Sequence, residues 1–320
     1  MPELERTEAE RTELEPGELE RQSKRLDLAK IRRIRATTPD AIGTVMQARR
    51  RRPVSAGDGR LFIIAADHPA RGALGVRGDN MAMANRYDLL ERLVTALERP
   101  GVDGVLGTPD VLEDLAILGA LENKIAVGSM NRGGLRGSAF EMDDRYTGYD
   151  IPGIRDARLD FAKLLIRINL SDPATARTLE KSARAVTQAA RAQLPIMLEP
   201  FMSEWVDGSI HNNLSPDAVI TSIAIAAGLG ASSAYSWLKL PVVAEMERVM
   251  EAATLPTLLL GGDPDGSPDE TYASWADALA LPGVHGLVVG RTILYPADDD
   301  VAAGVDRAAK LVHPNPQEAS

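Results

Sequence analysis

One lysine in an apolar stretch is a candidate nucleophile. The sequence holds seven lysines among its 36 basic residues, and Lys239 stands within Trp237-Leu238-Lys239-Leu240-Pro241. Arginine stays protonated at ordinary pH, whereas a buried lysine can lose its proton and attack a carbonyl carbon. Cations such as Lys163 or Arg167 would lower its pKa further if they lie nearby. Lys239 is therefore the candidate Schiff-base nucleophile; the alternative is a lysine whose ammonium reaches solvent from a strand end.

Two carboxylates also follow apolar runs. Glu199 ends Ile196-Met197-Leu198-Glu199, and Asp67 comes directly after the run at 61–66. A buried carboxylate is costly without a partner, so Glu199 is either a general acid/base for carbinolamine dehydration and carbon–carbon cleavage or a structural partner of Lys163 or Arg167. Asp67 would orient a substrate hydroxyl or relay a proton, or else cap the following loop. Lys163 and Arg167 share parity along one predicted strand and project to one side.

Glycines near the end of the chain favour a phosphate site. Gly261 and Gly262 follow one apolar run, and Gly290 and Arg291 follow the next. Glycine allows close backbone approach to an anion, and arginine binds phosphate with a planar fork. The four histidines are scattered, with no spacing typical of a metal site, so we expect neither a metal nor another cofactor.

The elements that must position these residues alternate regularly. Eight short apolar runs are separated by helix-length amphipathic stretches, as in a (β/α)8 TIM barrel. The runs span residues 61–66, 102–107, 124–128, 162–168, 195–199, 234–240, 257–260 and 284–289. A doubly wound sheet is the alternative, but the first run lacks the glycine fingerprint which that fold usually carries. In a barrel, the polar residues that follow the strands meet at one face.

The chain divides into two predicted parts. Residues 1–55 form a flexible or helical extension, with one or two helices over 31–50 broken near Thr37, and residues 56–320 form the catalytic barrel. The basic run at 49–52 is interpreted as a solvated helix end rather than a phosphate site. Two long loops, 129–159 and 200–214, should lie at the barrel face that carries active sites.

Composition narrows the possible partners. The formal charge of −10 favours binding of neither nucleic acid nor an anionic membrane. Cysteine is absent, there is no apolar leader, and no apolar run approaches the length of a membrane helix, so a cytoplasmic protein is predicted. We expect a barrel with apolar-faced helices and long loops to form a homo-oligomer.

Together these motifs resemble the class I aldolase superfamily over residues 61–312. The resemblance rests on Asp67-His68, Glu199-Pro200, Lys239, Gly261-Gly262 and Gly290-Arg291. Within it, the segments at 66–72, 128–134 and 237–239 look like an actinobacterial subgroup that is often labelled deoxyribose-phosphate aldolase and linked to inositol catabolism. The resemblance implies that Lys239 forms the Schiff base.

The same resemblance assigns the remaining roles. Asp67 matches the strand-one aspartate, and the four glycine and arginine positions near the end of the chain match the phosphate cradle. Glu199 and Lys163 look like the tagatose-bisphosphate and sulfofructose-phosphate branch. Typical deoxyribose-phosphate aldolases carry an aspartate on strand four and a second lysine on strand seven, whereas this chain has neither at 163–168 or 257–262.

The expected reaction is cleavage of a phosphorylated keto-sugar or sugar acid. The implied inositol context favours 2-deoxy-5-keto-gluconate 6-phosphate, giving dihydroxyacetone phosphate and malonate semialdehyde. Deoxyribose-phosphate, fructose-bisphosphate and tagatose-bisphosphate aldolases are alternatives. A phosphate-binding isomerase or synthase, in which Asp67 and Glu199 move protons, and a non-catalytic sugar-phosphate sensor also stay open.

Overall fold

A computed structural model describes residues 26–54, 57–131, 134–262 and 267–314. Eight parallel strands form a ring that is closed by the pairing of β4 with β5. The strands are β1 (Leu61–Ala65), β2 (Gly104–Gly107), β3 (Ile125–Ser129), β4 (Phe161–Ile168), β5 (Ile196–Val206), β7 (Ser236–Leu240), β8 (Thr257–Leu260) and β9 (Val284–Val289). Each of the eight predicted runs overlaps one of these strands, and the (β/α)8 barrel is confirmed.

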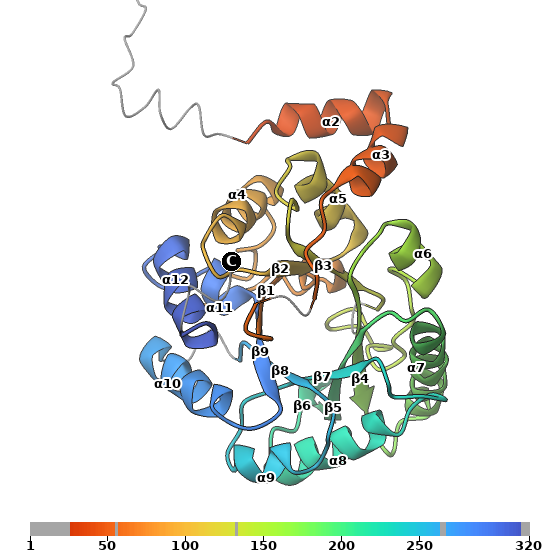
Figure 1. The fold of residues 1–320 in the computed structure, drawn as a ribbon. Helices are drawn as coiled ribbons and strands as arrows, with labels where there is room; N and C mark the ends of the chain where they lie inside the picture. The colour runs from red at the N-terminus through yellow and green to blue at the C-terminus, as the bar shows by residue number, and fades with distance from the viewer. Residues whose placement is uncertain (1–25, 55–56, 132–133, 263–266, 315–320) are drawn as a thin grey trace, which may run out of the picture.

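Helices surround the strand ring, as Figure 1 shows. They are α4 (Arg86–Leu97), α5 (Pro109–Ile117), α6 (Ile151–Asp156), α7 (Ala174–Arg191), α8 (Pro216–Ala227), α9 (Met246–Met250), α10 (Pro268–Leu279), α11 (Arg291–Leu294) and α12 (Val301–Val312), with a 3-10 helix η1 (Pro69–Arg71) after β1. Within the described part of the chain, no helix has the length and apolar character needed to cross a membrane.

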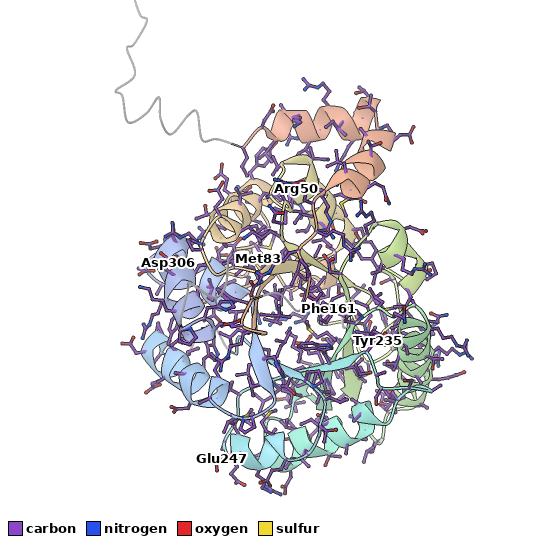
Figure 2. All side chains as sticks on the ribbon, viewed as in Figure 1. Arg50, Met83, Phe161, Tyr235, Glu247 and Asp306 are labelled. Atoms are coloured by element: carbon purple, nitrogen blue, oxygen red, sulfur yellow. The ribbon has the colours of Figure 1, made fainter. Side chains whose placement is uncertain are left out.

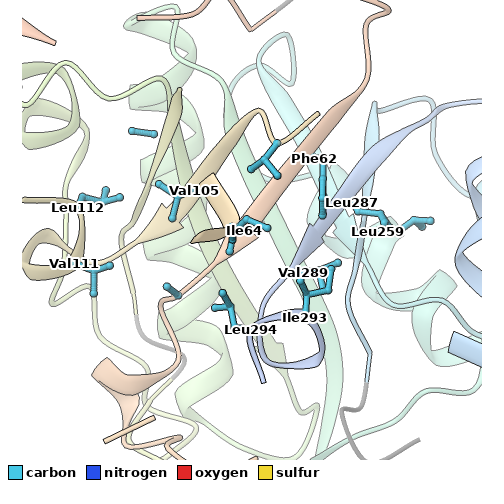
Figure 3. Close-up of a cluster of buried hydrophobic side chains, with 14 of the residues drawn as sticks. Phe62, Ile64, Val105, Val111, Leu112, Leu259, Leu287, Val289, Ile293 and Leu294 are labelled. Carbon is cyan, nitrogen blue, oxygen red and sulfur yellow. The ribbon is translucent and has the colours of Figure 1, made fainter. Parts of the chain in front are cut away.

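Alternation along each strand separates two apolar cores. Leu61, Ile63 and Ala65 of β1 pack inside the ring with residues such as Phe161, which lies within the ring in Figure 2. The intervening Phe62 and Ile64 face the helices, in the layer shown in Figure 3. Successive strand side chains point to opposite faces, so every second residue of a strand continues the row that fills the barrel.

The segment after the fifth predicted strand was expected to be a loop over 200–214, and this expectation is wrong. Strand β5 continues to Val206 and pairs with the antiparallel strand β6 (Ser209–Asn212). Asp207 and Gly208 between them both have positive φ, of 48° and 76°, and Asp-Gly is a favoured pair for such a two-residue turn. The hairpin extends the barrel wall beside the strand ends.

Before the barrel, the described residues 26–54 form two helices, α2 (Leu28–Thr37) and α3 (Asp40–Ala48), beside α5 in Figure 1. The predicted break near Thr37 is confirmed. Arg35 of α2 donates hydrogen bonds to Glu113 and Asp114 of α5. These contacts attach the helices to the barrel, while the proposed domain boundary at residue 55 remains a prediction.

The basic run that follows these helices is not a solvated helix end. Arg49 is 3% exposed, and its guanidinium lies 2.9 Å from a carboxylate oxygen of Asp160, just before β4. Arg51 binds the other oxygen of Asp160 at 2.7 Å, and Arg52 pairs with Asp103, just before β2. The run therefore binds the barrel at the ends where its strands begin, through carboxylates that are distant in the sequence.

We expect Asp160→Ala to lower the free energy of unfolding by about 3–5 kcal/mol, because it leaves Arg49 buried without its carboxylate. Glu122→Ala removes the exposed partner of Arg50 in the same basic run and should cost about 1 kcal/mol or less. Urea unfolding of both variants measures the difference. Equal, small losses would contradict a stabilising role for the buried pair.

Candidate active site

Four charged residues continue the inward-facing rows of the barrel. Each stands two positions after a residue whose side chain packs inside the ring or against that core: Asp67 after Ala65, Lys163 after Phe161, Glu199 after Met197, and Lys239 after Trp237. Their exposures are 7%, 4%, 8% and 4%. Strand alternation therefore brings together the four proposed catalytic residues from β4, β5 and β7 and from the position just after β1.

These side chains form a chain of alternating charge. The Lys163 ammonium lies 2.9 Å from Asp67 Oδ2 and 2.6 Å from Glu199 Oε2. The other oxygen of Glu199 accepts a hydrogen bond from Lys239 Nζ at 2.7 Å. Ser129 also donates to Asp67 Oδ2, at 3.2 Å. Lys239 thus bonds inside the barrel instead of reaching solvent, and Glu199 pairs with both lysines.

The two lysines differ in their protonation. Burial lowers the pKa of Lys239, and the positive Lys163 lowers it further, so that Glu199 only partly offsets the shift. Burial also disfavours charge on Lys163, but the carboxylates of Asp67 and Glu199 outweigh it and raise the pKa of Lys163. The environment therefore favours an amine that can deprotonate at Lys239 and a permanent cation at Lys163.

The carboxylates stay ionised beside these cations. Burial alone would raise the pKa of Glu199, but Lys163 and Lys239 lower it to about 2. Asp67 behaves likewise: the charge of Lys163 outweighs burial and holds the pKa of Asp67 well below its usual range. At neutral pH, Glu199 is thus a base within hydrogen-bond distance of the candidate nucleophile.

A cavity of about 430 Å³ opens over this cluster. Its walls include all four charged residues and the residues proposed to bind phosphate, which are Gly261, Gly262, Gly290, Arg291 and Arg167. The volume falls in the range of about 300–1,000 Å³ that is usual for small-molecule sites. The structure thus brings every predicted site residue to one cavity.

The glycines at the ends of β8 and β9 allow close packing there. A Cβ atom at Gly290 would lie 2.4 Å from the carbonyl oxygen of Ala65, and Gly262 has a φ of +71° that favours glycine. Beside them, Arg291 donates a hydrogen bond to the Gly75 carbonyl and Thr292 donates one to the Gly261 carbonyl. The geometry leaves backbone and a guanidinium, rather than bulky side chains, at this wall of the cavity.

The long loop after β3 supports the opposite wall. Asn131 is buried and binds both the N–H and the carbonyl of Leu165 through its amide, as a strand partner would. Glu141 accepts a hydrogen bond from Arg167 Nη1 at 2.7 Å, and its other oxygen accepts one from the Gly137 N–H. The expectation that loop 129–159 lies at the site is therefore met through residues that the sequence alone did not single out.

Two further cavity residues come from the loop after β1. His68 Nδ1 is buried with no hydrogen-bond partner among the described residues, and lies 3.9 Å from Asp67 Oδ1. Burial lowers the pKa of His68 to about 3, aided by the positive Arg291 and Arg71, so the ring is neutral. Arg71 lines the same cavity. The sequence places His68 only in the Asp67-His68 pair and Arg71 only within the segment 66–72, because a loop has no periodicity that reveals side-chain direction.

Sequence comparison identifies the family. The model of the Cgl0159-like family matches residues 59–309. The chain belongs to the Cgl0159-like family. The crystal structure of Cgl0159 from Corynebacterium glutamicum is 62% identical, with a TM-score of 0.87, and the match covers 94% of this chain and 99% of that one. No curated protein matches the chain in sequence.

More distant structures share the fold of this Cgl0159-like chain. A Schiff-base-forming fructose-1,6-bisphosphate aldolase is 17% identical with a TM-score of 0.59, over 85% of this chain and 99% of that one. An archaeal fructose-1,6-bisphosphate aldolase, with its catalytic lysine bound to the carbinolamine intermediate, is also 17% identical, with a TM-score of 0.62 and the same coverage. The barrel is thus the fold of class I aldolases.

Proposed function

We propose that this protein is a class I aldolase that cleaves a phosphorylated keto-sugar or sugar acid through a Schiff base on Lys239. The observation that carries the proposal is the buried Lys239 amine, whose pKa is lowered, 2.7 Å from the ionised Glu199. A buried lysine beside a base and a second cation is the environment that activates an amine toward carbonyl carbon. The fold shared with Schiff-base aldolases supports the same chemistry.

The proposed reaction begins with attack of neutral Lys239 Nζ on the substrate ketone. The resulting carbinolamine loses its hydroxyl as water, with Glu199 moving the proton, and a protonated imine forms. The imine withdraws electrons while Glu199, directly or through a hydroxyl, takes the proton of the substrate hydroxyl next to the breaking bond. The carbon–carbon bond then breaks to give an aldehyde and an enamine on Lys239.

Reprotonation of the enamine carbon and hydrolysis by water return free Lys239 and release the ketone product. Asp67 would orient a substrate hydroxyl, and the cation Lys163 keeps Asp67 and Glu199 ionised. Gly261, Gly262, Gly290 and Arg291 would hold the substrate phosphate through backbone N–H groups and a guanidinium.

We propose 2-deoxy-5-keto-gluconate 6-phosphate as the substrate, with dihydroxyacetone phosphate and malonate semialdehyde as products. The support is the resemblance to the subgroup linked to inositol catabolism. In addition, the residues of β4 and β8 lack the aspartate and second lysine of typical deoxyribose-phosphate aldolases. Fructose-bisphosphate and tagatose-bisphosphate belong in the same substrate screen.

Borohydride reduction tests the covalent step. Incubation with dihydroxyacetone phosphate and sodium borohydride should add the mass of the reduced ketone to one peptide, the one that contains Lys239. Peptide mass spectrometry locates the adduct, and Lys181, on the outer helix α7, serves as the internal control. Turnover of a substrate without any adduct on Lys239 would contradict the Schiff-base mechanism.

A further inference from the structure

The cavity is positive although the protein is acidic. Two carboxylates, Asp67 and Glu199, line it together with five basic side chains, which are those of Arg71, Lys163, Arg167, Lys239 and Arg291. Glu141 pairs with Arg167 from behind the wall, and Asp144 lies near Arg71 and Arg167. With Lys239 protonated, the five cations still exceed these four carboxylates by one. The whole chain carries a formal charge of −10. A local excess of positive charge in a partly enclosed site concentrates anionic ligands. The number of cations in this cavity suits a ligand with more than one anionic group.

Arg167 and Arg291 lie on opposite walls of the barrel. Strand β4, which carries Arg167, lies four strands from β9, after which Arg291 follows, in either direction around the eight-stranded ring. Strand β7, which carries Lys239, lies two strands from each of them. An extended ligand that reached from Arg291 to Arg167 would therefore place its middle over the candidate nucleophile.

The wall around Arg167 has unused donor capacity. Arg167 Nη1 binds Glu141, but Arg167 Nε is buried with no hydrogen-bond partner among the described residues. The Arg71 side chain, on the loop after β1, makes no hydrogen bond or ion pair with the described residues, although it lies in the cavity. Burial lowers the pKa of Arg71, and the strongest of the neighbouring charges acting on it is that of Arg167.

Two guanidinium groups that repel each other in a partly buried site cost free energy until an anion lies between them. A carboxylate or a phosphate accepts hydrogen bonds from two arginines and neutralises both. Lys163 already binds two of the nearby carboxylates, Asp67 and Glu199. A third, Asp144, feels the charges of Arg71 and Arg167, but it accepts a hydrogen bond from Asn131, and burial raises its pKa to about 6. The missing partner of Arg71 and Arg167 is therefore an anion brought by the ligand.

We propose that Arg71 and Arg167 form a second anion subsite for a carboxylate or phosphate at the far end of the substrate, with Arg167 on the wall opposite Arg291. The inference rests on the proposed function for its orientation of the ligand, with the reacting ketone over Lys239 and the first phosphate near Arg291. It narrows the substrate class to open-chain molecules with an anionic group at each end.

Binding of ligands that cannot react tests the subsite separately from the chemistry. Glucitol 6-phosphate carries one anionic end, whereas 6-phosphogluconate adds a carboxylate and glucitol 1,6-bisphosphate adds a phosphate to the same six-carbon chain. None has a ketone, so none can form a Schiff base. Calorimetric titration of the full chain should show at least one two-ended ligand binding about 30-fold or more tighter than glucitol 6-phosphate, the size expected for a buried charged contact.

Variants identify the residues responsible. Arg71→Met should remove most of the preference for two-ended ligands and leave the affinity for glucitol 6-phosphate within a few-fold. If Arg167→Met fails to fold, Arg167→Lys keeps a cation beside Glu141 and should still reduce the preference for two-ended ligands. Arg248→Met, on the outer helix α9, is the matched control and should change nothing.

The relative affinities of 6-phosphogluconate and glucitol 1,6-bisphosphate decide between a carboxylate and a phosphate as the second group. Equal affinity for all three ligands, or a preference that survives Arg71→Met, would overturn the subsite. These titrations do not depend on turnover. Preferential binding of two-ended ligands by a protein that does not catalyse aldol cleavage would therefore contradict the proposed function and still support the subsite.

Discussion

Replacement of Lys239 by methionine should abolish both turnover and borohydride trapping. Methionine keeps a similar length in a side chain that is 4% exposed but has no nucleophile. Loss of a covalent nucleophile costs about 10⁴-fold or more in kcat. Lys239→Arg should be equally inactive, because arginine keeps the positive charge beside Glu199 but stays protonated.

The Lys239→Arg variant distinguishes an aldolase from a phosphate-binding isomerase or synthase. In an isomerase or synthase, Lys239 would only bind charge, so Lys239→Arg would retain substantial activity. Lys181→Met, on α7, is the control for loss of a lysine and should keep wild-type kcat. Thermal unfolding of each variant checks that the barrel is intact, and an active Lys239→Arg enzyme would exclude the covalent mechanism.

Replacement of Glu199 by glutamine should reduce kcat by about 10²–10⁴-fold, the usual contribution of a general acid/base, while leaving Lys239 able to react. The charge of Glu199 raises the pKa of Lys239, against the lowering by burial and by Lys163. Without that charge the pKa of Lys239 falls further. Trapping with dihydroxyacetone phosphate should therefore extend to lower pH in Glu199→Gln than in the wild type.

Lys163→Met provides the opposite shift. Lys163 lowers the pKa of Lys239, so its removal should raise that pKa and move the trapping midpoint to higher pH. A purely structural role for either residue would reduce the yield of adduct without moving the midpoint. Midpoints that move in the same direction in both variants would contradict the assigned electrostatic roles.

The strand rows explain how much of the site could be predicted from the sequence. A strand has a period of two, so the polar residues two positions after Ala65, Phe161, Met197 and Trp237 could be expected to face the barrel interior. Regular alternation of strands and helices then determines that these positions meet at one end of the barrel. The four-residue cluster and the cavity wall of glycines and Arg291 follow from local patterns and one fold rule.

Other features depend on contacts that no local pattern contains. The sequence predicts a solvated helix end for Arg49 because its partner, Asp160, is remote in the chain and a basic run next to a helix is usually solvated. No pattern indicates that Arg71 faces the cavity, because η1 lies in a loop, where spacing does not predict side-chain direction. The β5–β6 hairpin was different: the Asp207-Gly208 pair was a visible turn signal that the loop interpretation overlooked.

The alternating array of Asp67, Lys163, Glu199 and Lys239 also bears on which form of the imine would persist. With Lys239 protonated, the four buried side chains sum to electroneutrality. A protonated imine on Lys239 keeps a cation beside Glu199 Oε1, whereas a neutral imine would leave that carboxylate oxygen without its positive partner. The carboxylate of Glu199 would thus favour the protonated imine, which withdraws electrons, over the neutral imine, which does not.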